Sequence, residues 1–171
     1  MWDLEFAKER HRLVHNREVK CIAVSANGRV IATGSFDSNV RIWSHQKAKL
    51  RRTLRKTHEK RVYCCALSAD GTILVSGDMR GVVAVTDLSA KEELGGTSSR
   101  LLAHTSSVSG CDVSADGSSV FSVGLDRLVA IWGTSGARGE KLGDAEEDHL
   151  GQVVEPAGAE QRLRYPDRRL A

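Results

Sequence analysis

Apolar and polar residues alternate with a period of two over many short segments of the chain. The clearest same-face pairs are Val40 and Ile42, Val83 and Val85, and Val129 and Ile131. Successive side chains of a β-strand point to opposite faces, so each pair marks one face of a strand. The alternation is interrupted by short clusters containing Gly, Asn or Asp, which are typical of turns. This pattern predicts an all-β protein made of many short strands.

The alternating segments form an internal repeat. Three segments of 29 residues superimpose without a gap, and they cover residues 15–43, 58–86 and 104–132. Their first residues lie 43 and then 46 positions apart, so the spacer varies while the unit keeps its length. A period of about 40 to 50 residues is typical of a β-propeller, in which each unit forms one blade.

Each unit predicts three strands, and the spacer predicts a fourth. The first strand is expected at residues 19–25, 62–68 and 108–114. The turn after it is expected at Asn27-Gly28, Asp70-Gly71 and Asp116-Gly117, residue types that tolerate a positive φ. The third strand is expected to end at Trp43, Thr86 and Trp132. The fourth strand is expected at residues 50–56 and 98–104.

With these features, the sequence resembles the WD40 repeat family, whose blades are four-stranded sheets around a central channel. The resemblance covers residues 1–154. It implies a His in the loop before the inner strand, a Ser or Thr on the second strand, an Asp in the next turn and a Trp at the end of the third strand. The first unit supplies His15, Thr33, Asp37 and Trp43. The third unit supplies His104, Ser122, Asp126 and Trp132.

The second unit departs from the family pattern. It keeps His58 and Ser76, but it has Arg80 and Thr86 where the pattern has Asp and Trp. The resemblance therefore implies two complete structural tetrads and one partial tetrad with an incomplete hydrogen-bond network.

Both ends of the repeat region resemble parts of blades. Trp2-Asp3-Leu4 matches the end of a third strand, and residues 6–14 are then expected to be a fourth strand before His15. At the other end, residues 149–154 repeat the His-x-x-x-Val start of a unit, and the pattern stops after Val154. We expect about three four-stranded blades in an open arc, as in a fragment or truncated form of a larger propeller. Residues 155–171 are rich in charge and have no period-two strand, which predicts a disordered tail.

Overall composition indicates an ordinary soluble protein. The chain has 171 residues, 27% of them charged, and a formal net charge of +3, so bulk charge identifies no partner. No apolar run approaches the roughly 20 residues that span a bilayer. The start of the chain lacks the basic and apolar regions of a secretory signal. We expect an intracellular protein, in the cytoplasm rather than the nucleus.

His104, Ser122 and Asp126 have the composition of a hydrolase triad. A similar set recurs in the first unit at His15, Thr33 and Asp37. A set that appears once per blade favours a buried polar network over catalysis, because an enzyme needs one distinctive site. We therefore expect no catalytic residues and no cofactor, and an enzyme of unknown type stays the least favoured alternative.

Four cysteines raise the alternatives of a metal site and of disulfide bonds. Cys21 and Cys64 occupy equivalent positions in the repeat, and so do Cys65 and Cys111. All four lie on expected inner strands, and no C-x-x-C spacing occurs. Small buried thiols are the favoured interpretation, and no metal ligand is expected.

Residues 47–61 form the most basic part of the chain. The segment contains Lys47, Lys49, Arg51, Arg52, Arg55, Lys56, Lys60 and Arg61. One interpretation is an outermost strand, because Lys and Arg prevent exposed edges from pairing with other chains. The alternative is a surface that binds nucleic acid or an anionic membrane. No aromatic residues interleave the charges as in a single-strand nucleic-acid platform, which favours the protected edge.

The resemblance implies a non-catalytic scaffold that presents loops and the rim of the channel to other proteins. Because the expected arc is open, we expect the chain to self-associate, to pair with another propeller fragment, or to be poorly stable.

Overall fold

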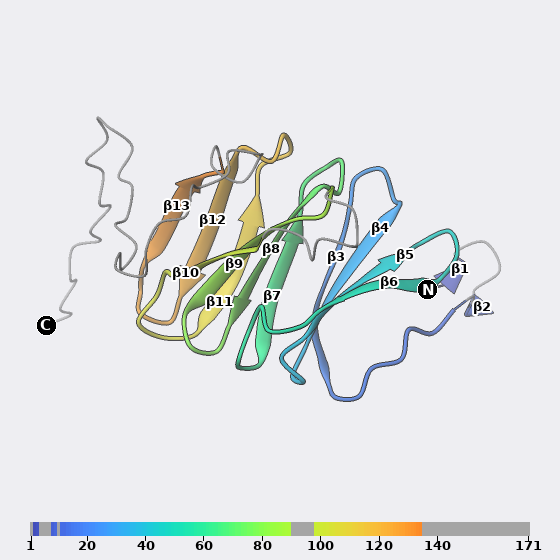
Figure 1. Cartoon of the computed structure of the whole chain (residues 1–171), viewed down its shortest axis with the longest axis horizontal. Coiled ribbons are helices and arrows are strands. Elements are labelled where there is room, and N and C mark those ends of the chain that lie inside the picture. The colour runs from blue at the N-terminus through green and yellow to red at the C-terminus, as the bar shows by residue number, and fades with distance from the viewer. Residues whose placement is uncertain (1, 4–7, 10, 90–97, 135–171) are drawn as a thin grey trace, which may run out of the picture.

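The structure is a computed structural model that describes residues 2–3, 8–9, 11–89 and 98–134. Within these ranges the chain forms thirteen β-strands and no helix. Figure 1 shows three sheets following one another in chain order, from β3 to β13. The predicted all-β fold class is confirmed.

The three sheets are antiparallel and correspond to the three sequence units. The first blade consists of β3 (Val19–Val24), β4 (Val30–Ser35), β5 (Val40–Ser44) and β6 (Lys49–Leu54). The second consists of β7 (Val62–Leu67), β8 (Ile73–Asp78), β9 (Val82–Asp87) and β10 (Ser98–Leu102). The third consists of β11 (Val108–Val113), β12 (Ser119–Gly124) and β13 (Val129–Gly133). Within each blade every strand pairs with the next along the chain, as hairpin connections require.

The strand boundaries differ from the predicted ones by one or two residues. Each inner strand ends one residue earlier, and the third strands run one residue past Trp43, Thr86 and Trp132. The outer strand predicted at residues 98–104 ends at Leu102, because the chain then turns so that the N–H groups of Ala103 and His104 donate to the Gly81 carbonyl.

A small two-stranded sheet precedes the first blade. β1 (Trp2–Asp3) pairs with β2 (Lys8–Glu9) in an antiparallel register. Residues 11–14 are not in a strand, so the fourth strand predicted over residues 6–14 is wrong in its second half. The expected blade start at residues 149–154 and the expected tail at residues 155–171 lie outside the described residues.

The turns between first and second strands follow the sequence prediction. Gly28, Gly71 and Gly117 have φ values of 65°, 76° and 73°, a conformation that costs a glycine little. The preceding side chain also fixes the turn, since Asn27 Oδ1 accepts from the Arg29 N–H and Asp70 Oδ1 accepts from the Thr72 N–H. Local sequence therefore encodes these hairpins.

The core lies between successive blades. The inner strand β7 packs against β3 and β4 on one side and against β11 on the other. Val62 of β7 and Val108 of β11 are completely buried in these two contacts. Each such valine contributes about 1.5–3 kcal/mol of hydrophobic free energy. The equivalent residue of the first blade, Val19, is 47% exposed because no described blade covers it.

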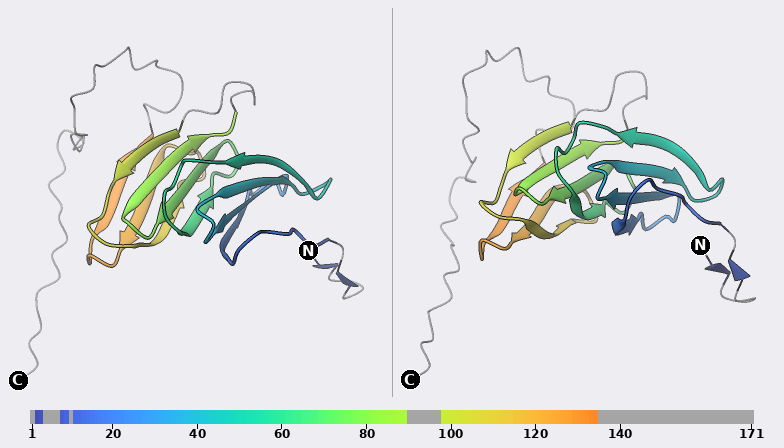
Figure 2. Two further views of the ribbon diagram at one scale, coloured as in Figure 1. Left: turned by 60° about the horizontal axis from the view of Figure 1, so that its bottom comes forward. Right: turned by 90° about the horizontal axis from the view of Figure 1, so that it is seen from below.

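The described sheets form an arc, and they do not close into a ring (Figure 2). Neighbouring blades are held by buried apolar side chains and by backbone hydrogen bonds, from Asn27 to Ala69 and from Ala69 to Ala115. The arrangement matches WD40-type blades in a partial propeller. It places the loops that precede the inner strands at one common rim.

Candidate interaction site and buried polar networks

The third blade holds a buried His, Ser and Asp in one network. With Nδ1 of His104 protonated, this N–H donates to Asp126 over 3.0 Å, and Nε2 accepts from the Ser122 hydroxyl over 2.5 Å. The His104 and Asp126 side chains are 0% and 4% exposed. Trp132 is half-buried and packs against the apolar core beside them. The network joins the loop before β11 to the turn after β12.

Asp126 also receives backbone hydrogen bonds. Its carboxylate accepts from the N–H groups of Thr105 and Leu128, each over 3.1 Å. Burial by itself raises the pKa of Asp126, but these N–H groups and His104 outweigh it and hold the pKa below its usual range. The carboxylate is therefore ionised and fixes the turn.

The second blade corrects the expectation of an incomplete network. His58 Nδ1 donates to Asp78 over 3.0 Å, and Nε2 accepts from the Ser76 hydroxyl over 2.8 Å. Asp78 lies two residues before Arg80, at the end of β8, and it reaches the same imidazole nitrogen as Asp126 does in the third blade. The family pattern expects the acidic residue at position 80 and therefore did not identify Asp78. The acidic residue in Gly77-Asp78-Met79 was the available signal.

The first blade departs from the expected tetrad at Asp37. His15 Nε2 accepts from the Thr33 hydroxyl over 2.8 Å, and the Trp43 indole N–H donates to Thr33 over 2.9 Å. His15 Nδ1, however, donates to the Leu13 carbonyl over 3.2 Å and not to a carboxylate. Asp37 instead forms an ion pair with Arg41, with a shortest N–O distance of 2.6 Å.

The ion pair and burial set the charges in the first blade. Burial by itself raises the pKa of Asp37, but the hydrogen bonds from Arg41 and Asn39 lower it to about 2. The pKa of His15 is lowered, mainly by burial and with a contribution from the positive charge of Arg41. Arg41 therefore binds the Asp37 carboxylate, which the repeat pattern predicts as the partner of His15.

The triad-like residues are closed to substrates. Ser122 is 1% exposed and His104 is 2% exposed, so neither the hydroxyl nor its base reaches solvent. No group of three or more His, Cys, Asp or Glu side chains suited to a metal ion occurs in the described part of the chain. Nor do the described residues include a helix long and apolar enough to cross a membrane.

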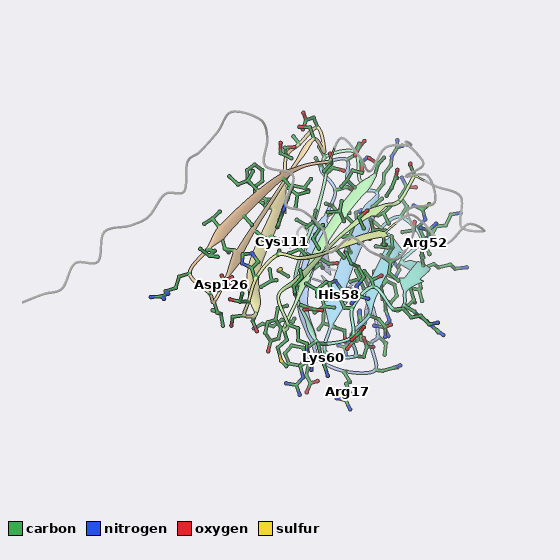
Figure 3. The ribbon with its side chains drawn as sticks, turned by 60° about the vertical axis from the view of Figure 1, so that its left-hand side comes forward. Arg17, Arg52, His58, Lys60, Cys111 and Asp126 are labelled. Atoms are coloured by element: carbon green, nitrogen blue, oxygen red, sulfur yellow. The ribbon has the colours of Figure 1, made fainter. Side chains whose placement is uncertain are left out.

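The eight basic residues of the predicted segment do not form one surface. Lys49, Arg51 and Arg52 lie on the outer strand β6, where Arg51 is exposed and Arg52 is half-buried. Lys60 and Arg61 lie instead in the loop before β7, at the rim. Figure 3 shows Lys60 and Arg17 at the same end of the molecule, and Arg52 away from it. Beside β6 is an open groove of about 610 Å³ lined by Val14, Asn16, Asn39, Arg41, Leu50, Thr53, Arg55 and Lys56.

The rim carries a cluster that the sequence reasoning missed. The Arg61 guanidinium lies over the Phe36 ring, 5.0 Å from its centroid, and Phe36 meets Tyr63 at 5.7 Å between ring centroids. Phe36 belongs to the first blade, and Arg61 and Tyr63 belong to the second. A cation over an aromatic face is stabilising by about 0.5–1 kcal/mol where exposed.

Phe36 is the first member of a repeated series. Met79 and Leu125 occupy its position in the second and third blades, and we call these three residues the rim series. Their backbone N–H groups donate to the carbonyls of Glu18, Arg61 and Ser107 over 2.9–3.0 Å. Met79 is 39% exposed and Leu125 is 66% exposed. A large apolar residue 21 positions after each repeat His was the signal in the sequence.

Comparison with known proteins agrees with the blade geometry. The family model described as "WD domain, G-beta repeat" matches residues 7–44, 48–87 and 96–133, which is more than half of the chain. The chain belongs to the WD40 repeat family. The family resemblance inferred from the sequence is thereby confirmed, and the matched ranges each contain one blade-forming unit.

Solved WD40 structures share the fold at low sequence identity. "Structure of U3-55K" and "Crystal structure of RRP9 WD40 repeats" each superimpose with a TM-score of 0.69 and 22% identity. The alignments cover 80% of this chain and 42% of each of those chains. This WD40 chain therefore spans less than half the length of the structures it matches. A search of curated proteins found no significant match.

Proposed function

We propose that this WD40 chain is a non-catalytic protein-interaction scaffold that binds its partner through the rim series and Arg61. The observation that carries this proposal is the placement of large apolar side chains and a stacked arginine on the same exposed rim. WD40 propellers in general serve as interaction scaffolds, and fold alone does not select the surface. The burial of Ser122 and His104 supports a function without catalysis.

The composition of the rim supports a binding role. Aromatic residues, Met and Arg are enriched at the centres of protein interfaces, where a few side chains contribute most of the binding energy. Met79 and Arg61 are exposed, whereas the backbone of the rim is fixed by the hydrogen bonds that close each blade. A preorganised backbone lowers the entropic cost of binding.

We also consider binding of an anionic polymer or anionic membrane through β6 as a second candidate function. β6 and β10 are equivalent outer strands, and both are largely exposed. β6 carries Lys49, Arg51 and Arg52, whereas β10 carries Arg100 alone. If protection of the edge were the only reason for the charges, β10 would need them equally. The difference favours a role specific to β6.

One set of variants separates the two candidate functions. In the Met79→Ser/Leu125→Ser variant, we expect recovery of specific partners in quantitative affinity purification to fall about tenfold, because two interface side chains are lost. In the Arg51→Ser/Arg55→Ser variant, recovery is expected to stay unchanged. Leu102→Ser is the matched control, since Leu102 is 80% exposed on the outer strand β10 and is not a member of the rim series.

The opposite result would overturn the rim proposal. Loss of partners in the Arg51→Ser/Arg55→Ser variant alone, with binding to anionic vesicles or nucleic acid that weakens steeply as salt is raised, would instead support the second candidate. Equal losses in the Leu102→Ser control would mean that the effect is not specific to the rim series.

We further propose that the outer faces of the first and third blades bind additional blades, from a second copy or from another propeller fragment. Val129 and Ile131 are 67% and 62% exposed, whereas their equivalents Val83 and Val85 are buried by the next blade. Val123 stands where the other blades have Gly34 and Gly77. The Val123 side chain fills the space that these glycines leave open. A strand of an additional blade is therefore expected to pack farther from β12 than β7 packs from β4.

Size-exclusion chromatography of the purified chain tests this association. We expect elution ahead of the 18.6 kDa monomer, with binding of the dye ANS that is reduced in the Val129→Ser/Ile131→Ser variant. A dilute monomer that melts sharply and binds no ANS would contradict the proposal.

A further inference from the structure

The four cysteines are distributed so that each contact between inner strands receives two of them. Cys21 and Cys64 lie six residues after the repeat His, and Cys65 and Cys111 lie seven residues after it. Cys64 and Cys65 are neighbours on β7, so their side chains point to opposite faces. Cys65 consequently faces the first blade, which holds Cys21, and Cys64 faces the third blade, which holds Cys111.

The sulfur atoms of Cys21 and Cys65 both contact the same short stretch of β4. A Cβ atom added to Gly34 would lie 2.5 Å from Cys21 Sγ, so this thiol occupies the space that the glycine leaves open. Cys65 Sγ donates to the Ala32 carbonyl over 3.8 Å. Ala32 and Gly34 are two residues apart on the same strand, so the thiols of two different blades converge there.

The second pair repeats this geometry one blade further along. A Cβ atom added to Gly77 would lie 2.6 Å from Cys64 Sγ, and Cys111 Sγ donates to the Val75 carbonyl over 3.9 Å. Val75 and Gly77 are the β8 equivalents of Ala32 and Gly34. Figure 3 shows Cys111 inside the stack of sheets. The two interfaces between blades therefore bring two thiols together in the same arrangement.

The two thiols of the first pair differ in acidity. A hydrogen bond from Cys65 lowers the pKa of Cys21, and the same contact, together with burial, raises the pKa of Cys65. The hydrogen bond with Cys64 and burial likewise raise the pKa of Cys111. Because the thiolate is the nucleophile, Cys21 is the attacking sulfur of the first pair.

We propose that Cys21–Cys65 and Cys64–Cys111 are oxidation sites at which a hydroperoxide forms disulfide bonds between neighbouring blades. The four thiols are free in the reduced chain. Each bond joins residues that are more than 40 positions apart, so it links one blade covalently to the next. Together the two bonds cross-link all three blades at their inner strands.

The oxidation proceeds in two steps. The Cys21 thiol loses its proton, and the thiolate attacks the terminal peroxide oxygen as the O–O bond breaks, which gives a sulfenic acid. The departing alkoxide, or hydroxide from hydrogen peroxide, takes up that proton and leaves as the alcohol or as water. The Cys65 thiol then attacks the oxidised sulfur, loses its proton and expels the hydroxyl group as water. One hydroperoxide is reduced for each disulfide formed, and a dithiol such as dithiothreitol reverses the bond.

Peptide mapping by mass spectrometry of the full chain, after treatment with hydrogen peroxide and without reduction, tests the pairing. We expect two cross-linked peptides, one joining Cys21 to Cys65 and one joining Cys64 to Cys111. We also expect a rise in Tm of roughly 10 °C that dithiothreitol reverses, because the bonds restrict the unfolded chain.

Single substitutions provide the matched controls. Cys21→Ser and Cys65→Ser should each abolish the first cross-link and leave the second intact, and Cys111→Ser should do the reverse. A Cys64–Cys65 bond, disulfides between chains, or sulfinic and sulfonic acids without cross-links in the wild-type chain would overturn the proposal. The mapping of the wild-type chain decides the question even if a variant fails to fold.

Discussion

The Asp78→Ala variant is expected to lower the free energy of unfolding by about 3 kcal/mol, whereas Arg80→Ala changes it by less than about 0.5 kcal/mol. Asp78 is 1% exposed and accepts from His58 Nδ1 and from the N–H groups of Arg80 and Val82. Its loss leaves these donors buried without an acceptor. Urea denaturation followed by tryptophan fluorescence measures the difference.

Asp126→Ala is expected to resemble Asp78→Ala, because Asp126 accepts from His104, Thr105 and Leu128. Arg80 is the matched control in the same turn, since its side chain is exposed. Equal shifts in the denaturation midpoint for Asp78→Ala and Arg80→Ala would show that Asp78 does not complete the second network.

The same carboxylates give the stability a defined pH dependence. Burial raises the pKa of Asp78, but the hydrogen bonds from His58 and from the backbone lower it below the ordinary value of 3.8. A carboxyl group with a lowered folded pKa stabilises the protein above its unfolded pKa, and the contribution is lost as the pH falls through the folded pKa. The difference between wild type and Asp78→Ala should therefore shrink below about pH 4.

The Gly77→Ala variant is expected to lower the free energy of unfolding by about 3 kcal/mol, because the added methyl group overpacks the contact between two blades. Its Cβ would lie 2.6 Å from Val108 Cγ1 and 2.8 Å from Val108 Cβ. Val108 is completely buried and β-branched, so it has little freedom to move aside. Thermal melting of the purified variant measures the loss.

Gly110→Ala is the matched control on the neighbouring inner strand. The nearest atom to its added Cβ is Val123 Cγ2 at 3.1 Å, and Val123 is 40% exposed and able to shift. We expect a loss below about 1 kcal/mol for this variant. If the two substitutions lowered Tm equally, close packing between blades would not be the reason for glycine at position 77.

The second blade shows how a repeat pattern assigns residues wrongly. Alignment gives each unit one fixed position for the acidic residue, and that position holds Arg80 in the second blade. A turn places several backbone positions near the same imidazole, so Asp78 reaches His58 from two residues earlier. In the first blade the residue at the expected position is acidic, yet Arg41 on the adjacent strand binds it instead. Competition among nearby partners decides such contacts.

The sequence by itself determined the elements that depend on neighbours along the chain. Period-two alternation located the strands, and turns such as Asn27-Gly28 located the hairpins, because strand faces and turn conformations are local properties. The threefold repeat of the 29-residue unit predicted the number of described blades and the membership of the WD40 repeat family. Cys64 and Cys65 were correctly placed on an inner strand for the same reason.

Only the tertiary structure decided which side chains meet across blades. Cys65 of the second blade meets β4 of the first blade, next to the strand β3 that carries Cys21, and Arg61 stacks on Phe36 of another blade. The burial of Ser122 likewise depends on residues from other strands. A pattern along one chain fixes the face on which a residue lies, but not the neighbour that covers it. That neighbour is set by how successive sheets stack, because close packing admits a thiol or a valine only where a residue such as Gly34 leaves room.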